Sequence, residues 1–134
     1  HARDYCEAMW MILQNDHPGD FIVATGRTAS VRDFANLAFS VLGITVKFFG
    51  EGINEFAVCV SVDDEVLRGN VELVGKTVLS VDERFYRPLE VDHLLGDSDK
   101  ARRILKWEPR TSFEQLVSEM VWHDYSLAGQ ECNV

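Results

Sequence analysis

Apolar and polar residues alternate with a helical period at the start of the chain. The apolar positions follow the i, i+3, i+4 spacing of one helix face and are Tyr5, Ala8, Met9, Ile12 and Leu13. We expect this helix to end before Pro18-Gly19, since a proline cannot continue it. The run from Phe21 to Thr25 is short and apolar, which is compatible with a buried strand.

A capping box marks the start of the next predicted helix. Ser30 stands at the cap position and Asp33 follows three residues later, so that each side chain can accept a backbone N–H at the other position. The apolar face of this helix is Phe34, Leu37, Ala38, Val41 and Leu42. Gly43 suits the position after a helix, because glycine adopts positive φ without strain. The segment from Thr45 to Phe49 predicts a strand.

The rest of the chain alternates weaker strands with two further helices. Residues 50–75 are acidic and contain glycine, and we expect a loop there with one or two weak strands around Val58, Val60 and Val62. The segment from Thr77 to Val81 predicts another strand. Ser98 is expected to cap a helix whose inward residues are Ala101, Ile104 and Leu105. Ser112, with Gln115 three residues on, is expected to cap the last helix, whose apolar stripe is Phe113, Leu116, Val117, Met120 and Val121.

This order of elements predicts the α/β class. The strands are too few and too short for a complete doubly wound domain. We therefore expect residues 1–134 to be a single fragment, the smaller substrate-binding domain of a two-lobed enzyme with flanking elements of the nucleotide-binding lobe attached. The chain opens on His1 without an initiator methionine, and we expect it to be a piece of a longer protein.

Composition and charge exclude several classes of partner. With 46% hydrophobic and 26% charged residues, the chain is typical of soluble globular proteins, and no apolar run approaches the ~20 residues that span a bilayer. A net charge of −9 disfavours nucleic-acid binding, which needs a basic surface. Three scattered cysteines, Cys6, Cys59 and Cys132, argue for a reducing compartment, and we expect a cytoplasmic protein.

Catalytic and cofactor motifs are missing from the sequence. The closest approach to G-x-G-x-x-G is Gly50-Glu51-Gly52, but position 55 is Glu and no helical pattern follows, so we predict no dinucleotide site here. No serine, cysteine or histidine nucleophile motif is present, and the histidines lack metal-ligand spacing, so we predict no catalytic and no metal-binding residue.

The stretch from Phe85 to Pro109, FYRPLEVDHLLGDSDKARRILKWEP, resembles the C-terminal segment of nucleotide-sugar enzymes of the extended short-chain dehydrogenase/reductase family, which are of the Rossmann type. Within that family, four further blocks resemble the GDP-mannose 4,6-dehydratases: HARDYCEAMWMILQ, FIVATG, SVRDF and SEMV. The resemblance implies a lyase that converts GDP-mannose to GDP-4-keto-6-deoxymannose on the route to GDP-fucose. It also implies that NADP and a catalytic Tyr/Lys pair belong to a lobe that this chain lacks.

The resemblance implies that Arg3 and Arg87 approach the diphosphate of the substrate. In this family an arginine of an RDY-like stretch and one of an Arg-Pro stretch play that part, and both stretches are present here. The guanidinium fork matches phosphate oxygens and keeps its charge at every physiological pH. Proline after Arg87 restricts its backbone to an extended conformation. The alternative for Arg3 is an ion pair with Glu7, one helical turn on.

Three more residues are candidates for contacts with the substrate. Glu90 can accept hydrogen bonds from sugar or ribose hydroxyls, or it can be an exposed acid paired with Arg84 or Arg87. Tyr86 can pack on the guanine or ribose, or it can belong to the core. Arg32 lies at a helix start, where its charge opposes the macrodipole, so it either contacts an anion or is a solvated surface arginine.

Two other functions stay open at this point. One is a different epimerase, reductase or dehydratase of nucleotide sugars, which the Arg-Pro segment alone would allow. The other is a non-catalytic binding protein derived from such an enzyme. For the complete protein we expect a homo-oligomer that binds GDP-mannose, and we expect the isolated chain to be inactive.

Overall fold

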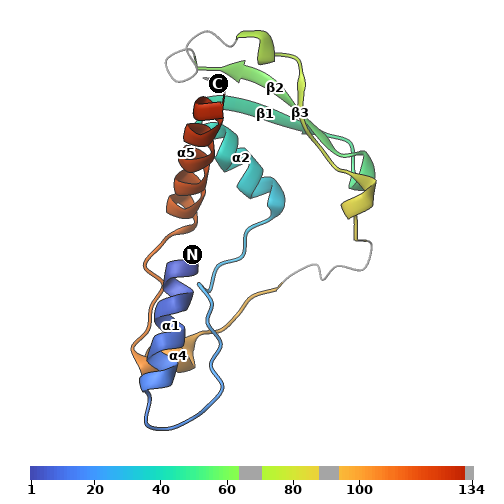
Figure 1. The fold of residues 1–134 in the computed structure, drawn as a ribbon. Helices are drawn as coiled ribbons and strands as arrows, with labels where there is room; N and C mark the ends of the chain where they lie inside the picture. The colour runs from blue at the N-terminus through green and yellow to red at the C-terminus, as the bar shows by residue number, and fades with distance from the viewer. Residues whose placement is uncertain (64–70, 88–93, 132–134) are drawn as a thin grey trace. The chain divides into compact units, whose positions relative to one another are not determined.

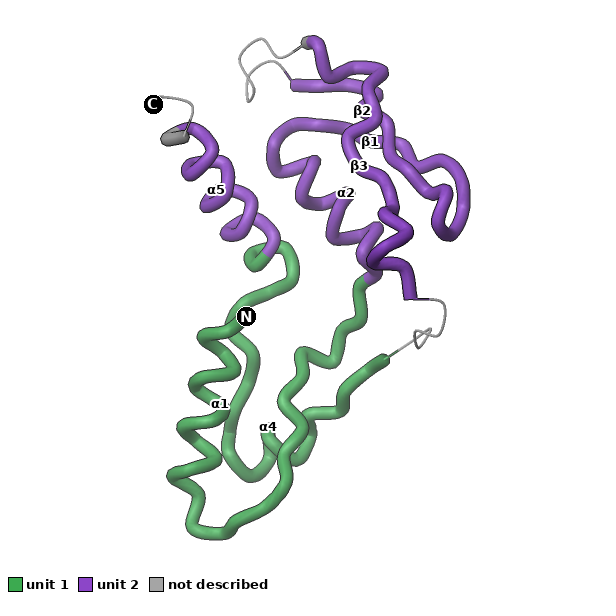
Figure 2. Tube along the Cα trace, turned by 45° about the vertical axis from the view of Figure 1, so that its right-hand side comes forward, with its two compact units in different colours: residues 1–29, 91–116 green, residues 30–90, 117–134 purple. Residues whose placement is uncertain are grey.

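A computed structural model describes residues 1–63, 71–87 and 94–131, and these fall into two compact units (Figure 2). Unit 1 comprises residues 1–29 and 91–116, and unit 2 comprises residues 30–90 and 117–134, each as far as it is described. The described elements mix helices with a small sheet, in the order α1, α2, β1, β2, β3, α4 and α5, with short 3-10 helices between them (Figure 1).

Unit 1 is built on two helices, α1 (Ala2–Gln14) and α4 (Asp99–Leu105), which pack against each other. Its core is a small cluster in which Ala8, Ala101 and Trp107 are almost fully buried. Met11, Phe21, Val23 and Leu105 pack around this cluster. The predicted first helix is confirmed, but the larger apolar side chains of its predicted face stay exposed, at 44% for Tyr5, 56% for Met9 and 81% for Leu13.

The strand expected for Phe21 to Thr25 is wrong, since this segment forms no strand and belongs to no sheet among the described residues. A strand needs a neighbour that completes its ladder of hydrogen bonds. Here Phe21 and Val23 instead pack by their side chains onto the core cluster. The chain around Gly96 passes so near that a Cβ at that position would come within 2.6 Å of the Ala24 Cβ.

Helix α4 starts where the sequence predicts, but its cap differs. Ser98 is the cap residue, yet its side chain makes no capping hydrogen bond, and the Asp97 carboxylate accepts the Asp99 N–H at 2.9 Å instead. Of the residues predicted to face inward, Ala101 is buried, whereas Ile104 is 45% exposed and was assigned to the wrong face. Leu105, the third of these residues, packs against the core cluster as predicted.

Unit 2 contains α2 (Val31–Val41) and a three-stranded antiparallel sheet of β1 (Ile44–Phe49), β2 (Phe56–Val62) and β3 (Thr77–Ser80), in the order β1-β2-β3. Helix α2 packs against β1. The capping box of Ser30 and Asp33 is present with both reciprocal hydrogen bonds, and Gly43 has a φ of 69°, as predicted. The segment thought to hold weak strands supplies β2, the central strand of the sheet.

The last helix, α5 (Phe113–Glu131), begins with the predicted cap. The Ser112 hydroxyl accepts the Gln115 N–H at 3.1 Å, and the Gln115 amide oxygen accepts the Ser112 N–H at 2.9 Å. Val117 is fully buried, in agreement with the predicted stripe, but Met120 is 45% exposed. Among the described residues, no helix has both the length and the apolar character needed to cross a bilayer.

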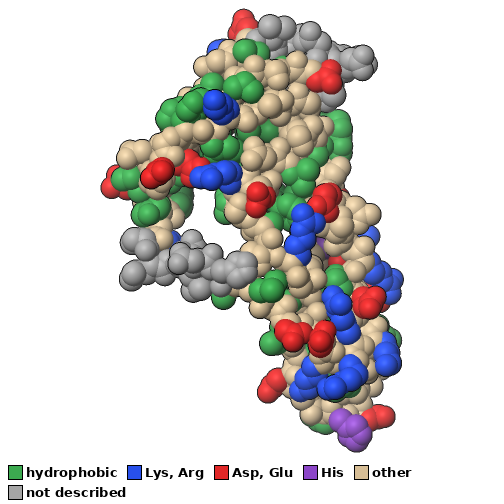
Figure 3. All heavy atoms as spheres, turned by 180° about the vertical axis from the view of Figure 1, so that it is seen from behind, with side chains coloured by type: hydrophobic (Ala, Val, Ile, Leu, Met, Phe, Trp, Pro, Cys, Tyr) green, Lys and Arg blue, Asp and Glu red, His purple; other side chains and the backbone are tan. Residues whose placement is uncertain are grey.

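Charge is unevenly spread over an acidic chain. Lys and Arg side chains gather over unit 1 (Figure 3), and on and just after α4 they are Lys100, Arg102, Arg103 and Lys106, all of them exposed. Asp99 is exposed beside them, and Lys100 also donates a hydrogen bond to the Asp20 carbonyl at 2.8 Å.

Candidate functional site

Strand β1 ends, β2 begins and β3 ends at the same end of the sheet in unit 2, which we call the sheet end. Phe49, the last residue of β1, pairs with Phe56, the first of β2, and Phe56 also pairs with Ser80, the last of β3. The rings of Phe49 and Phe56 stack with centroids 5.7 Å apart. The loops that leave this edge carry several of the residues singled out in the sequence. In Figure 1 the sheet end lies at the right, beside two short 3-10 helices.

The first loop of the sheet end has a backbone that only glycine permits. Gly50 has a φ of 76°, and a Cβ there would collide with the Asn54 carbonyl oxygen. The 3-10 helix Gly52–Asn54 follows and ends at Glu55, whose N–H donates to the Gly52 carbonyl at 3.2 Å. The Gly50-Glu51-Gly52 segment therefore forms a tight turn into a single 3-10 turn. This geometry does not fit the glycine-rich turn that cradles a dinucleotide at the start of an α-helix.

The second loop carries Tyr86 and Arg87. It follows β3 through the 3-10 helix Glu83–Phe85, which is capped by the Asp82 carboxylate accepting the Arg84 N–H at 2.9 Å. The Arg84 guanidinium also binds this carboxylate, which lowers the pKa of Asp82 and raises that of Arg84. Both Tyr86 and Arg87 are exposed. The alternative of a core tyrosine is thus wrong, because Tyr86 is 45% exposed.

The Tyr86 hydroxyl reaches the first loop. It lies 3.8 Å from the point that a Cβ on Gly52 would occupy. Glu90, the acid predicted to bind sugar or ribose, lies outside the described residues, as does Pro88.

Arg32 approaches the same sheet end from the first turn of α2. Its Nε donates to Glu55 Oε1 at 2.8 Å, its Nη2 pairs with the same oxygen, and its Cζ lies 5.5 Å from the centroid of the Phe48 ring. Arg32 is therefore not a purely solvated arginine, because its guanidinium is paired with the Glu55 carboxylate. The structure brings Arg32, Glu55 and Tyr86 to one end of unit 2, and Arg87 directly follows Tyr86 in the chain.

Arg3 belongs to unit 1, where it lies exposed near the start of α1. The alternative pairing of Arg3 with Glu7 is wrong, because the Glu7 carboxylate pairs with Arg110. The His1 imidazole accepts the backbone N–H of Arg3 at 3.0 Å and caps the helix.

Asp4, next to Arg3, is a buried acid that ties α1 to the segment before α5. Its carboxylate accepts the Thr111 N–H at 3.0 Å, and its carbonyl accepts Trp107 Nε1 at 3.0 Å. Burial alone would raise the pKa of the Asp4 carboxyl. Hydrogen bonds from Thr111 and from the Arg110 backbone outweigh that effect and lower the pKa.

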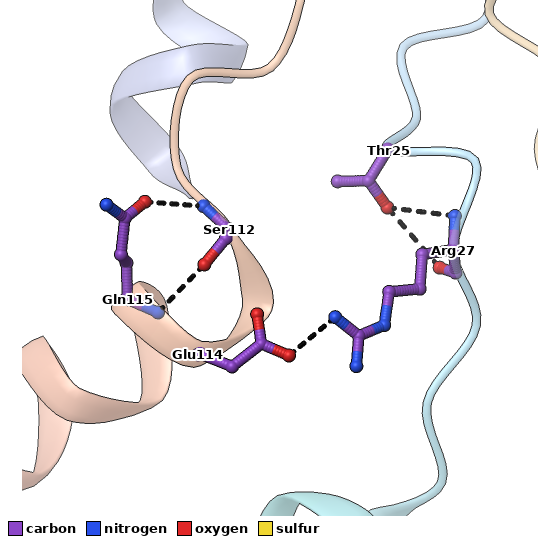
Figure 4. Close-up of polar contacts among 5 residues, drawn as sticks. All are labelled: Thr25, Arg27, Ser112, Glu114 and Gln115. Carbon is purple, nitrogen blue, oxygen red and sulfur yellow. Dashed lines mark hydrogen bonds and ion pairs between the residues drawn. The ribbon is translucent and has the colours of Figure 1, made fainter.

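Unit 1 also contains a cavity of about 550 Å³ that sequence reasoning did not predict. It is lined by the start of α1, the segment around Arg27 and the start of α5. Arg27 pairs with Glu114 at 2.6 Å and lies 5.3 Å from the centroid of the Phe113 ring, beside the Ser112–Gln115 cap (Figure 4). The Glu114 pKa is lowered by its own backbone N–H and by Arg27.

Residues 1–120 match the sequence profile of a family described as GDP-mannose 4,6 dehydratase. The chain belongs to the GDP-mannose 4,6-dehydratase family. The resemblance read from the Arg-Pro stretch and the accompanying blocks is therefore confirmed. Within this family, the chain is 45% identical to the GDP-mannose 4,6 dehydratase of Dictyostelium discoideum over 124 residues, which are 92% of the chain and 32% of that relative.

Other relatives in the GDP-mannose 4,6-dehydratase family show a similar identity and cover a similar share of the chain. The chain is 47% identical to the Sinorhizobium fredii protein over 94% of its length and 32% of the relative. It is 44% identical to the human protein over 95% of its length and 31% of the relative. The chain thus spans about a third of the length of the curated relatives it matches, and that third is the C-terminal one.

Sequence reasoning found most of the sheet end but missed Glu55, Asp4 and Arg27. Glu55 was assigned no role, because nothing local marks it as the partner of Arg32, which lies 23 residues earlier. Asp4 had a weak signal, since an acid in the first turn of a helix is common for other reasons. Arg27 directly follows Gly26, and the turn at Gly26, whose φ is 74°, sets the direction of the chain at Arg27.

Proposed function

We propose that this chain forms the nucleotide-sugar-binding portion of a GDP-mannose 4,6-dehydratase. The complete protein would convert GDP-mannose to GDP-4-keto-6-deoxymannose on the route to GDP-fucose. The observation that carries this proposal is the family match across residues 1–120. The exposed arginine that follows the last strand of the sheet supports it, because an accessible guanidinium at a fixed sheet end suits a diphosphate.

In this proposal Arg87 binds the diphosphate from the sheet end, and Arg3 contributes from α1. Both side chains are exposed, which suits contacts with phosphate oxygens of a ligand. Tyr86 would pack on the guanine or ribose, and Glu90 would accept hydrogen bonds from hydroxyl groups. Arg32 differs from these residues, since Glu55 already occupies two of its donors.

We assign NADP and the catalytic Tyr/Lys pair to the remaining two thirds of such a protein, in an extended short-chain dehydrogenase/reductase fold of the Rossmann type. The turn at Gly50 does not fit a dinucleotide, so no step of the reaction is placed on this chain. Unit 2 would be the core of the substrate-binding domain, and unit 1 would supply flanking elements of the nucleotide-binding lobe. The isolated chain would then be inactive.

A homo-oligomer and a cytoplasmic location complete the proposal. Exposed apolar residues on α1 and α5, among them Trp10 and Trp122, suit contacts with further protein surface. The two described cysteines, Cys6 and Cys59, are free thiols, in keeping with a reducing compartment.

A chimaera tests this proposal directly. Residues 1–134 would replace the matching C-terminal third of the Dictyostelium discoideum relative, to which they are 45% identical. We expect the chimaera to form the 4-keto-6-deoxy product from GDP-mannose and to prefer GDP-mannose over UDP- and dTDP-sugars. A folded chimaera that binds UDP- or dTDP-sugars better, or that binds no sugar nucleotide, would contradict the proposal.

A further inference from the structure

The ion pair between Arg32 and Glu55 joins two elements of unit 2 that are distant in the sequence. Arg32 lies in the first turn of α2, and Glu55 immediately precedes β2. Two donors of the guanidinium converge on a single carboxylate oxygen. The Glu55 side chain is 20% exposed and that of Arg32 is 57% exposed, so the carboxylate is the more enclosed partner.

Glu55 is also fixed through its backbone. Its N–H donates to the Gly52 carbonyl at 3.2 Å, and its carbonyl accepts the Val81 N–H at 2.9 Å. Val81 is the first residue beyond β3, where the chain turns toward Tyr86 and Arg87. Glu55 therefore connects α2, the start of β2 and the exit of β3.

The position of the segment from Val81 to Arg87 depends on the contacts of Glu55 and of the loop that it follows. Val81 is held by Glu55, the next turn is closed by Asp82, and the Tyr86 hydroxyl lies over Gly52. A shift of Glu55 would move both the Val81 hydrogen bond and the loop that Tyr86 contacts. Arg87 follows Tyr86 directly, so its backbone would move with them.

We propose that Arg32 and Glu55 form a positioning pair that sets the direction in which Arg87 leaves the sheet end, and that Arg32 is not itself a ligand of the diphosphate. This rests on the function proposed above. Two donors of Arg32 are occupied and its charge is neutralised at close range, so it adds little attraction for a dianionic group. If Arg32 turned to a diphosphate, it would leave the largely enclosed Glu55 carboxylate unpaired beside that anion.

The first test uses the 134-residue chain without ligand. Amide and Arg87 Nε signals of nitrogen-15-labelled protein would be compared for the parent, Arg32→Ala, Glu55→Gln and the reversed pair Arg32→Glu with Glu55→Arg. We expect both single variants to shift and broaden the Tyr86 and Arg87 signals, and the reversed pair to restore them in part. Matched controls are Glu72→Gln, whose carboxylate is 91% exposed, and Lys47→Ala, a cation on β1 that lies over Phe49.

The second test is a GDP titration of the same variants in the chimaera. Each single variant should weaken binding by roughly threefold to tenfold, the range that an indirect contact typically modulates, and the reversed pair should recover part of it. Arg32→Lys separates the two roles further, because a lysine keeps the positive charge but not the guanidinium geometry.

Unchanged Tyr86 and Arg87 signals in both single variants would overturn the positioning role. So would a loss of GDP binding in Arg32→Ala that the reversed pair does not recover, because that result would make Arg32 a direct ligand. If the signals move as expected while the parent chimaera binds no GDP, the positioning pair stands and the proposed function fails.

Discussion

Asp4→Asn is the substitution that we expect to weaken unit 1 most selectively. The residue Asp4 is 4% exposed, and its carboxylate accepts the Thr111 N–H at 3.0 Å, with further hydrogen bonds from the Thr111 side chain and the Arg110 backbone. A carboxylate can accept all of these, whereas an asparagine amide presents one acceptor and one donor group. At least one buried donor would therefore face the amide nitrogen.

The expected cost follows from that mismatch. An unsatisfied buried donor costs about 1–3 kcal/mol, and exchanging a charged acceptor for a neutral one costs about 1 kcal/mol more. At pH 7 the free energy of unfolding should thus fall by about 2–4 kcal/mol. The pKa of Asp4 is lowered in the folded chain, so its stabilisation is complete above the unfolded value of about 3.9 and disappears as the pH falls through the folded value.

Urea unfolding between pH 7 and pH 2 measures both effects. Trp107 is a suitable fluorescence reporter, because its buried indole donates to the Asp4 carbonyl. The difference between parent and Asp4→Asn should shrink toward zero with acidification, and Asp16→Asn, an exposed acid in the same unit, should match the parent throughout. A difference that stays constant down to pH 2 would refute the reasoning.

Three further predictions concern the isolated chain. It should neither bind NADPH in calorimetry nor turn over GDP-mannose, and turnover above a buffer control would disprove this. Gly50→Ala should destabilise unit 2 by at least about 2 kcal/mol, because φ is positive and the Cβ meets the Asn54 carbonyl, whereas Gly129→Ala in α5 should be neutral or stabilising in the same unfolding assay. The exposed apolar side chains of α1 should make the chain bind a hydrophobic dye or self-associate, and a dye-negative monomer at high concentration would count against the two-lobed picture.

Local chemistry was predictable from the sequence at several positions where both partners lie within one helical turn, but not at Ser98, whose side chain makes no capping hydrogen bond. The capping boxes at Ser30 and Ser112 and the glycine after α2 are of this kind. The strand from Phe21 to Thr25 was mispredicted because a strand depends on a neighbouring strand, which local composition does not reveal.

The candidate site was predictable only in part, for the same reason. Arg87 and Tyr86 stood out by resemblance to a family motif, and the structure brings Tyr86 to the sheet end. Glu55 lies 23 residues from its partner Arg32, and Thr111 lies 107 residues from its partner Asp4. No periodicity in the sequence connects the two members of either pair. Such contacts come from tertiary packing, so they appear only once the fold is known.

The most direct test of the proposed function is a calorimetric titration of GDP and GDP-mannose into the chimaera and its Arg87→Ala variant. Loss of one charge-assisted hydrogen bond, worth about 1.5–3 kcal/mol, should weaken both ligands by roughly 10- to 150-fold. Arg87→Lys should recover only part of this, and Arg102→Ala, an exposed arginine in unit 1, should bind like the parent. If folded Arg87→Ala binds GDP as tightly as the parent, Arg87 does not hold the diphosphate and the proposed site is wrong.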